Sequence, residues 1–232
     1  MIPLRDNIPS VHTPYAMWAI IALNALAWLW TLSLAPGAQF QVFHVYGVTP
    51  LRFADPSWAH HMGYPDGRAT ALFTSLFLHG GFMHLLLNMW MLWIFADNIE
   101  DVTGPWRFAA FYLTCGLASL LAHILANPGS ATPVIGASGA ISGVMGAYAM
   151  LYPHAKVRTL IPIIIIPFIF DVPAVLFLGA WLAMQLFSGI ASVETGGSGG
   201  VAWWAHLGGF AAGAALIPFF RRRGRCYYCF RP

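Results

Sequence analysis

Six apolar runs, each close to the length that crosses a lipid bilayer, dominate this sequence of 232 residues. A membrane core about 30 Å thick is crossed by about 20 apolar residues in helical conformation. We therefore predict an all-α membrane protein whose six transmembrane helices lie at residues 16–34, 80–96, 107–126, 135–152, 172–190 and 201–220.

The composition excludes a water-soluble protein. Charged residues make up 8% of the chain and hydrophobic residues 59%, whereas about a quarter of the residues in ordinary globular proteins are charged. So few charges cannot cover a surface that faces water. The ten tryptophans fit a protein anchored at membrane interfaces, where indole rings gather. As partners we expect membrane lipid and no nucleic acid.

Two segments fall outside this pattern. Residues 160–170 are apolar but short, and Pro162 and Pro167 would interrupt a helix. We predict a connector that lies on the membrane; if the segment spanned the bilayer, the helix count would be seven. The long first loop, 35–79, is predicted to pack on the membrane. No internal repeat or boundary is visible, so residues 1–232 are predicted to form a single domain.

The distribution of basic residues predicts the orientation. With six spans, the arginines of segment 221–225, the pair Lys156 and Arg158, Arg107 and Arg5 all lie on one side. The positive-inside rule places that side in the cytoplasm, together with both termini. The two arginines of the first loop lie on the other side, but two acidic residues accompany them.

The three cysteines do not form the framework of a secreted protein. Cys115 lies in an apolar run and is predicted to be a small packing residue. Cys226 and Cys229 have CxxC spacing, but one such pair supplies only half of a zinc site. We favour two reduced thiols on a cytosolic tail over metal binding.

The stretch GASGAISG at residues 136–143 places small and polar residues inside an apolar region. Helices in membranes associate through close packing, which small residues four positions apart permit. Gly139 and Gly143 form such a pair. Helix packing alone could therefore explain the stretch, although it also contains the hydroxyl of Ser138.

The last apolar run supplies a possible partner for that hydroxyl. His206 lies in this run beside a second small pair, Gly209 and Gly213. A histidine at membrane depth is a functional candidate, although a hydrogen bond to a backbone carbonyl would also account for it. Two helices with glycine faces could bring Ser138 and His206 together. A serine becomes a nucleophile when an adjacent base removes its proton.

His84 and Asn88 are four residues apart and so share one face of the second predicted helix. Both can donate hydrogen bonds to an oxyanion, but interhelical hydrogen bonds or a metal site are alternatives. We disfavour metal because His79 is placed on another face of that helix. Asp97 would lie about 13 Å further along the helix than Asn88, so a serine–histidine dyad without an acid is the simpler prediction.

These residues together resemble the rhomboid family of intramembrane serine proteases, particularly its short bacterial members. The family's GxSG motif matches residues 136–139, its AHxxG motif matches 205–209, and its HxxxN motif matches 84–88. The opening residues 1–10 are also similar to bacterial rhomboids, as is the stretch 100–108, which is structural in the family. The three motifs occur in order, each in a separate predicted span.

The resemblance implies that Ser138 is the nucleophile and His206 its general base. It also implies that His84, Asn88 and the backbone N–H of Ser138 stabilise the oxyanion. No metal or organic cofactor is expected. Substrates would be transmembrane helices weakened by glycine, proline or polar residues, with a small residue at the cleaved position, in a bacterial inner membrane. Some relatives have an aromatic residue where this chain has Ser142, so a hydroxyl or another helix would hold the histidine ring.

A non-enzymatic membrane protein is the competing interpretation. A small channel, a transporter or a binder of transmembrane helices would also contain polar residues at membrane depth. Asn127 and Pro128 match half of a water-channel motif. The sequence has no second Asn-Pro-Ala copy and no inverted repeat, which a transporter would be expected to show.

Overall fold

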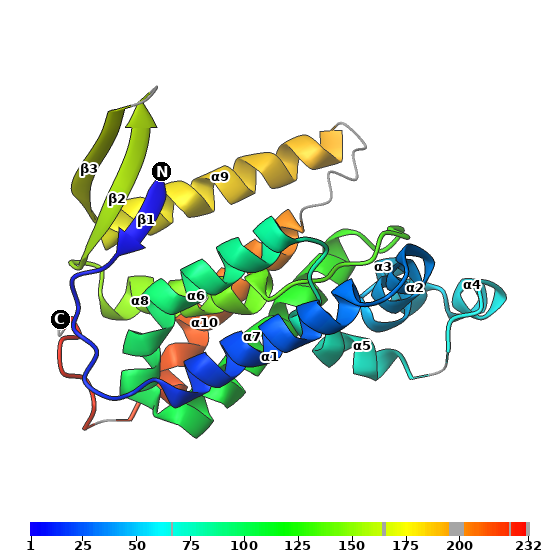
Figure 1. Ribbon diagram of the computed structural model, residues 1–232, viewed down its shortest axis with the longest axis horizontal. Helices are drawn as coiled ribbons and strands as arrows, with labels where there is room; N and C mark the ends of the chain where they lie inside the picture. The colour runs from blue at the N-terminus through cyan, green and yellow to red at the C-terminus, as the bar shows by residue number, and fades with distance from the viewer. Residues whose placement is uncertain (66, 164–165, 195–201, 223, 231–232) are drawn as a thin grey trace.

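The computed structural model describes residues 1–65, 67–163, 166–194, 202–222 and 224–230. Within these ranges the protein is a mostly helical membrane bundle, in which helices run back and forth between two ends (Figure 1). The helices that do so are α1 (Tyr15–Leu32), α6 (Phe82–Thr103), α7 (Pro105–Ala126), α8 (Ser138–Leu151), α9 (Ala174–Glu194) and α10 (Trp203–Phe220).

Each predicted span overlaps one of these helices. Five of the helices are long and apolar enough to cross a membrane, and α8, with 14 residues, is shorter. A helix of that length extends about 21 Å, less than the thickness of a bilayer core. Residue 201, the first residue of the sixth predicted span, lies outside the described residues.

The second span is longer than predicted because its polar end is covered. Helix α6 continues to Thr103, and the carboxylates of Glu100 and Asp101 are almost fully buried within it. Glu100 accepts hydrogen bonds from the backbone N–H groups of Ala16 and Met17, at 2.9 and 2.8 Å. These groups belong to the first turn of α1, whose N–H groups have no partner within the helix. Glu100 therefore caps α1, which is a structural role.

The all-α prediction missed a small antiparallel sheet of three strands, β1 (Ile2–Arg5), β2 (Lys156–Ile163) and β3 (Ile166–Pro173), in that order. The segment 160–170 is thus mostly the hairpin of β2 and β3, with residues 164–165 outside the described ones. Isoleucines favour extended backbone, and β1 supplies a pairing partner that is about 150 residues distant in the chain.

The two ends of the bundle differ in content. The sheet and both termini lie at one end, and the first loop lies at the other (Figure 1). That loop is a set of short helices: α2 (Pro36–Tyr46), α3 (Pro50–Ala54), α4 (Pro56–His61), α5 (Arg68–Thr74) and the 3₁₀ turn η1 (Ser75–Phe77). Buried Arg52 holds it together by donating to the carbonyls of Val45 and Pro65, at 2.9 and 2.7 Å.

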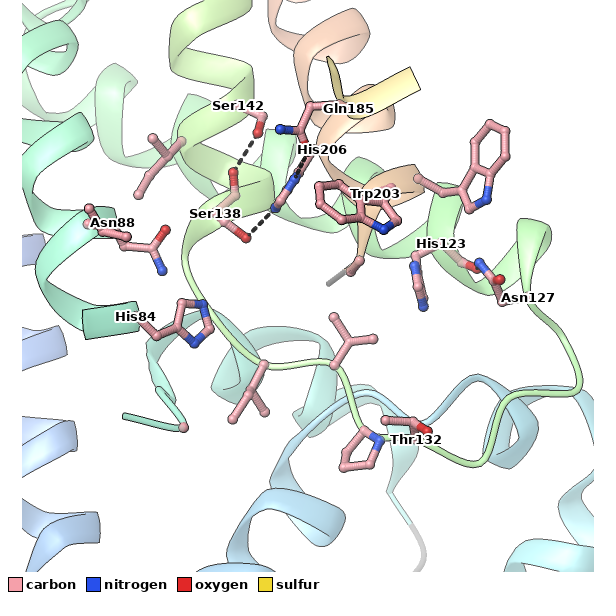
Figure 2. Close-up of a pocket in the computed structure, with 18 of the residues that line it drawn as sticks. His84, Asn88, His123, Asn127, Thr132, Ser138, Ser142, Gln185, Trp203 and His206 are labelled. Atoms are coloured by element: carbon pink, nitrogen blue, oxygen red, sulfur yellow. Dashed lines mark hydrogen bonds between the residues drawn. The ribbon is translucent and has the colours of Figure 1, made fainter. Parts of the chain in front are cut away.

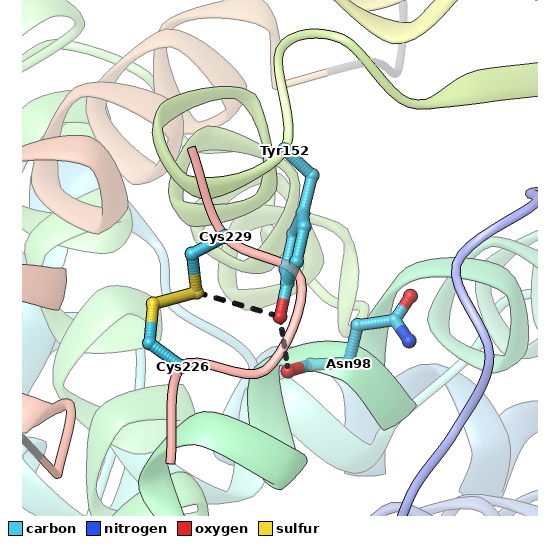
Figure 3. Close-up of a disulfide and its surroundings, with 4 residues drawn as sticks. All are labelled: Asn98, Tyr152, Cys226 and Cys229. Atoms are coloured by element: carbon cyan, nitrogen blue, oxygen red, sulfur yellow. Dashed lines mark hydrogen bonds between the residues drawn. A yellow bond between two sulfur atoms is a disulfide. The ribbon is translucent and has the colours of Figure 1, made fainter. Parts of the chain in front are cut away.

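The C-terminal tail contains a disulfide, not two reduced thiols (Figure 3). The chain turns so that the Cα atoms of Cys226 and Cys229 are 5.3 Å apart, a separation that a disulfide spans. Cys229 Sγ is 3.8 Å from Tyr152 Oη, and the backbone N–H of Phe230 donates to the Leu151 carbonyl. The prediction considered the two side chains without this turn, which brings the sulfurs together against the end of α8. Cys115 is buried and free, as predicted for a packing residue.

Helices α8 and α10 pack through the two glycine pairs identified in the sequence. Gly209 lies against the carbonyl of Gly139, and Gly213 lies against the backbone of Gly143. A methyl group added at Gly213 would be 2.6 Å from the Gly143 Cα and still closer to its carbonyl. Real Cβ atoms do not approach backbone so closely, so only glycine fits. This contact confirms the predicted close approach of the two helices.

We expect Gly213→Ala to lower the stability of the folded protein by about 1–3 kcal/mol, because the new methyl group would push α8 and α10 apart. The control is Gly179→Ala in α9, where an added Cβ meets no atom within 4 Å. That variant should be unchanged or slightly stabilised, since alanine favours a helix. Unfolding of the purified variants in detergent measures both effects. Equal stability of the two variants would contradict the packing argument.

Candidate active site

Ser138 begins helix α8, directly after a backbone turn at Gly136. The φ of Gly136 is +122°, which favours glycine. A Cβ at this position would lie 2.7 Å from His84 Nε2 and 3.6 Å from Asn88 Nδ2. The side chains of His84 and Asn88 therefore pack against the backbone two residues before Ser138.

The structure brings Ser138 and His206 into hydrogen-bond contact. The Ser138 Oγ and the His206 Nε2 are 2.8 Å apart, although the residues are 68 positions apart in the chain. Both side chains are half-buried. Ser138 stands at the first turn of α8 and His206 in the first turn of α10, so the glycine contact between these helices sets their separation. A hydroxyl and an imidazole at this distance can exchange a proton.

The other ring nitrogen of His206 contacts a different helix. His206 Nδ1 is 2.7 Å from the Gln185 Oε1, on α9 (Figure 2). Ser142 does not hold the ring, because its hydroxyl donates to the carbonyl of Ser138, at 2.7 Å. The sequence left two supports for the histidine ring open, a hydroxyl or another helix. In the structure the support comes from another helix, α9. Trp181, also on α9, lies with its ring 5.9 Å from the imidazole.

Asn88 is held by a histidine that the sequence analysis placed wrongly. His79 does not lie on another face of the helix, because α6 begins only at Phe82. The Asn88 Nδ2 is 3.0 Å from His79 Nε2, and the ring of His79 is 5.0 Å from that of His84. Donation to His79 uses one of the two N–H groups of the Asn88 amide. The second N–H group has no hydrogen-bond acceptor among the described residues.

Five of these residues, Ser138, His206, His84, Asn88 and Gln185, line one cavity of about 730 Å³. Figure 2 shows His84 and Asn88 on one side of Ser138 and Gln185 with His206 on the other. His123 and Asn127, at the end of α7, line a further part of the same cavity. The Nδ1 atom of His123 is buried and has no hydrogen-bond partner among the described residues. A cavity of this size, with a largely apolar wall and a few polar side chains, has room for water and for an extended segment of peptide.

Gln185, His79 and His123 were missed from the sequence. Gln185 could have been found, because it is a polar side chain in the apolar run 172–190, and such residues are functional candidates. His79 could not, because its contact with Asn88 depends on where α6 begins. Within the described ranges, no group of three or more His, Cys, Asp or Glu side chains is arranged to hold a metal ion.

Comparison with known families agrees with the motifs. Residues 66–223, which are more than half of the chain, match the Rhomboid domain. The chain belongs to the rhomboid family. Membership supports an intramembrane protease, and the apolar helices support a multi-pass membrane protein.

Several curated proteins are similar to this chain. Rhomboid protein 1, mitochondrial, of Saccharomyces cerevisiae is 35% identical over 149 residues, which are 60% of this chain and 38% of that protein. A Bacillus subtilis protein named "Putative rhomboid protease YdcA" is 30% identical over 132 residues, 57% of this chain and 60% of the relative. Presenilin-associated rhomboid-like protein, mitochondrial, of Bos taurus is 28% identical over 62% of this chain and 36% of its own length. The chain thus spans between about a third and three fifths of these relatives.

Burial of His79 predicts a pH dependence of stability. Burial and the neighbouring His84 lower the pKa of His79 from 6.5 to about 4. Between these values the unfolded chain binds more protons than the folded one, so stability is complete above about pH 6.5 and falls as the pH approaches 4. The loss should be of order 1–3 kcal/mol. Unfolding in detergent across this range measures it.

His79→Gln is the matched variant, because its side-chain oxygen can still accept the hydrogen bond from Asn88 but does not titrate. Its stability should depend less steeply on pH than that of the wild type between pH 4 and 6.5. Identical slopes for the two proteins would show that His79 is not the titrating group.

Proposed function

We propose that this protein is an intramembrane serine endopeptidase, which hydrolyses peptide bonds in or near the transmembrane helices of other membrane proteins. The observation that carries the proposal is the 2.8 Å contact between Ser138 Oγ and His206 Nε2, in a cavity whose largely apolar wall also carries His84 and Asn88. Membership of the rhomboid family supports the same class of enzyme. Ser138 and His206 are the proposed dyad.

In this mechanism the Ser138 Oγ attacks the carbonyl carbon of the scissile peptide bond as its proton passes to the His206 Nε2. The protonated imidazole then gives that proton to the departing amine, which leaves an acyl-enzyme ester on Ser138. Water enters the cavity, loses a proton to His206 and attacks the ester. The carboxylic acid product departs and the proton returns to Ser138.

Three donors are proposed to stabilise the negative oxygen of the tetrahedral intermediate. The backbone N–H of Ser138 is in the first turn of α8, where N–H groups have no partner within the helix. The partial positive charge at a helix N-terminus also favours the developing charge. The free N–H of Asn88 and the ring of His84 lie beside the preceding turn at Gly136, so they reach the same region from α6.

The short α8 gives a physical reason for a site beneath the membrane surface. If the end of α8 near the sheet is level with the ends of its neighbours, Ser138 lies about 9 Å inside the opposite surface. A substrate helix is protected there by its own backbone hydrogen bonds and must unwind before its carbonyl reaches Ser138. We therefore expect substrate segments weakened by glycine, proline or polar residues, with a small residue at the cleaved position.

We further propose that residues 1–232 act as one domain in a bacterial plasma membrane, with both termini in the cytoplasm. The pairing of β1 with β2 supports this orientation, because it places Arg5 opposite Arg158 at one end of the bundle. The C-terminal tail lies at the same end (Figure 1). Positively charged residues on one side favour the cytoplasmic face.

Replacing either member of the dyad should abolish cleavage. We expect Ser138→Ala and His206→Ala to lose at least about 1,000-fold in kcat/KM, while Ser33→Ala, at the exposed end of α1, cleaves like the wild type. The assay uses purified protein in detergent with a single-span membrane protein as substrate. Either dyad variant cleaving at the wild-type rate would refute the assignment. A phosphonate that labels serine nucleophiles should label the wild type at Ser138; no labelling under these conditions would favour a non-enzymatic protein.

Asn88→Ala should lower kcat by about 100-fold and change KM little, because the lost hydrogen bond forms mainly in the transition state. The control is Asn24→Ala in α1, which also removes a buried amide, one that donates to the Ile20 carbonyl of its own helix. It should retain most of the turnover. Unchanged kcat for Asn88→Ala would remove this residue from the oxyanion site.

A further inference from the structure

We propose that Gln185 is a positioning residue that holds the imidazole of His206 in the tautomer needed for proton transfer from Ser138. The inference rests on the proposed function and adds a third member, from a third helix, to the dyad. It starts from the 2.7 Å contact between the Gln185 Oε1 and His206 Nδ1 (Figure 2). Gln185 is 5% exposed, so water competes little for this contact.

The chemistry of the two atoms fixes where the ring proton lies. An amide oxygen only accepts hydrogen bonds, so the ring nitrogen that faces it must carry the proton. A neutral imidazole with its proton on Nδ1 has a free electron pair on Nε2. That electron pair faces the Ser138 hydroxyl, at 2.8 Å. With the other tautomer, Nε2 would carry a proton and could not accept one from the serine.

The same contact favours the charged intermediate. When Nε2 takes the proton of Ser138, the ring becomes positive, and the Nδ1–H bond to the Gln185 oxygen strengthens. The cavity lining contains no Asp or Glu side chain among the described residues, so an amide occupies the place that a carboxylate fills in a Ser-His-Asp triad. A neutral amide is also less costly than a carboxylate to bury at membrane depth.

The surroundings of Gln185 show that it is directed inward. Its neighbours on α9, Met184, Leu186 and Phe187, are 55%, 42% and 71% exposed, as expected of side chains that face lipid. Trp181, one turn earlier, lies with its ring against the imidazole. Helix α9 therefore presents an apolar face outward and an amide with an indole toward His206.

Three variants test the role. Gln185→Leu removes the acceptor and keeps most of the volume, so kcat should fall between about fivefold and about 100-fold with KM changed less than about twofold. Gln185→Glu keeps an acceptor at the same position and should retain most of the activity that Gln185→Leu loses. Met184→Leu, on the lipid-facing side of α9, should match the wild type. Labelling of Ser138 by the phosphonate should slow in parallel with kcat.

The outcomes separate this inference from the proposed function. A wild type that neither cleaves nor labels at Ser138 would overturn both. An active wild type with an equally active Gln185→Leu variant would overturn the positioning role alone, as would equal losses for the Leu and Glu variants.

A spectroscopic measurement decides the point even if Gln185→Leu folds poorly. Nitrogen NMR of the wild type labelled at histidine, with His206 assigned by comparison with His206→Ala, should show the His206 proton on Nδ1. A proton on Nε2 would overturn the inference.

Discussion

The contact between α8 and α10 is the constraint on which the proposed site depends. Gly209 and Gly213 lie directly on the backbone of Gly139 and Gly143, closer than any side chain would permit. In a membrane, where neighbouring lipid is as apolar as the helix surface, such close packing is a main source of helix association. The first turns of both helices are thereby brought together, and these turns carry Ser138 and His206. The glycines thus have a positional role beyond packing.

Polar groups that surround this contact come from three other helices and from the loop before α6. The loop before α6 supplies His79, which accepts a hydrogen bond from the amide of Asn88 on α6. Helix α9 supplies Gln185, and α7 supplies His123. Burying a polar side chain at this depth is costly unless it has a partner, and the amides of Asn88 and Gln185 both have one. The site therefore contains two hydrogen-bonded groups, Asn88 with His79 and Ser138 with His206 and Gln185, and each joins residues that are distant in sequence or lie on different elements.

The errors of the sequence analysis have a common cause. The polar end of α6 looked like the end of a span, but the N-terminal segment covers Glu100 and uses it as a cap for α1. Residues 160–170 looked like a connector, but β1 gives them a pairing partner. Cys226 and Cys229 looked like separate thiols until the turn of the tail joined them. In each case the structure of the segment depends on a backbone arrangement that the local sequence does not specify.

The sequence by itself determined the membrane environment, the approximate spans, the glycine pairs and the identity of Ser138, His206, His84 and Asn88 as candidates. Apolar length and small-residue spacing are local properties, and the rhomboid motifs are short, so they can be read without coordinates. Only the tertiary structure decided that Gln185 faces His206, that His79 holds Asn88, and that Ser142 bonds to the backbone. Hydrogen bonds between helices require both helices to be placed to within an ångström, and that placement follows from the packing of the whole bundle.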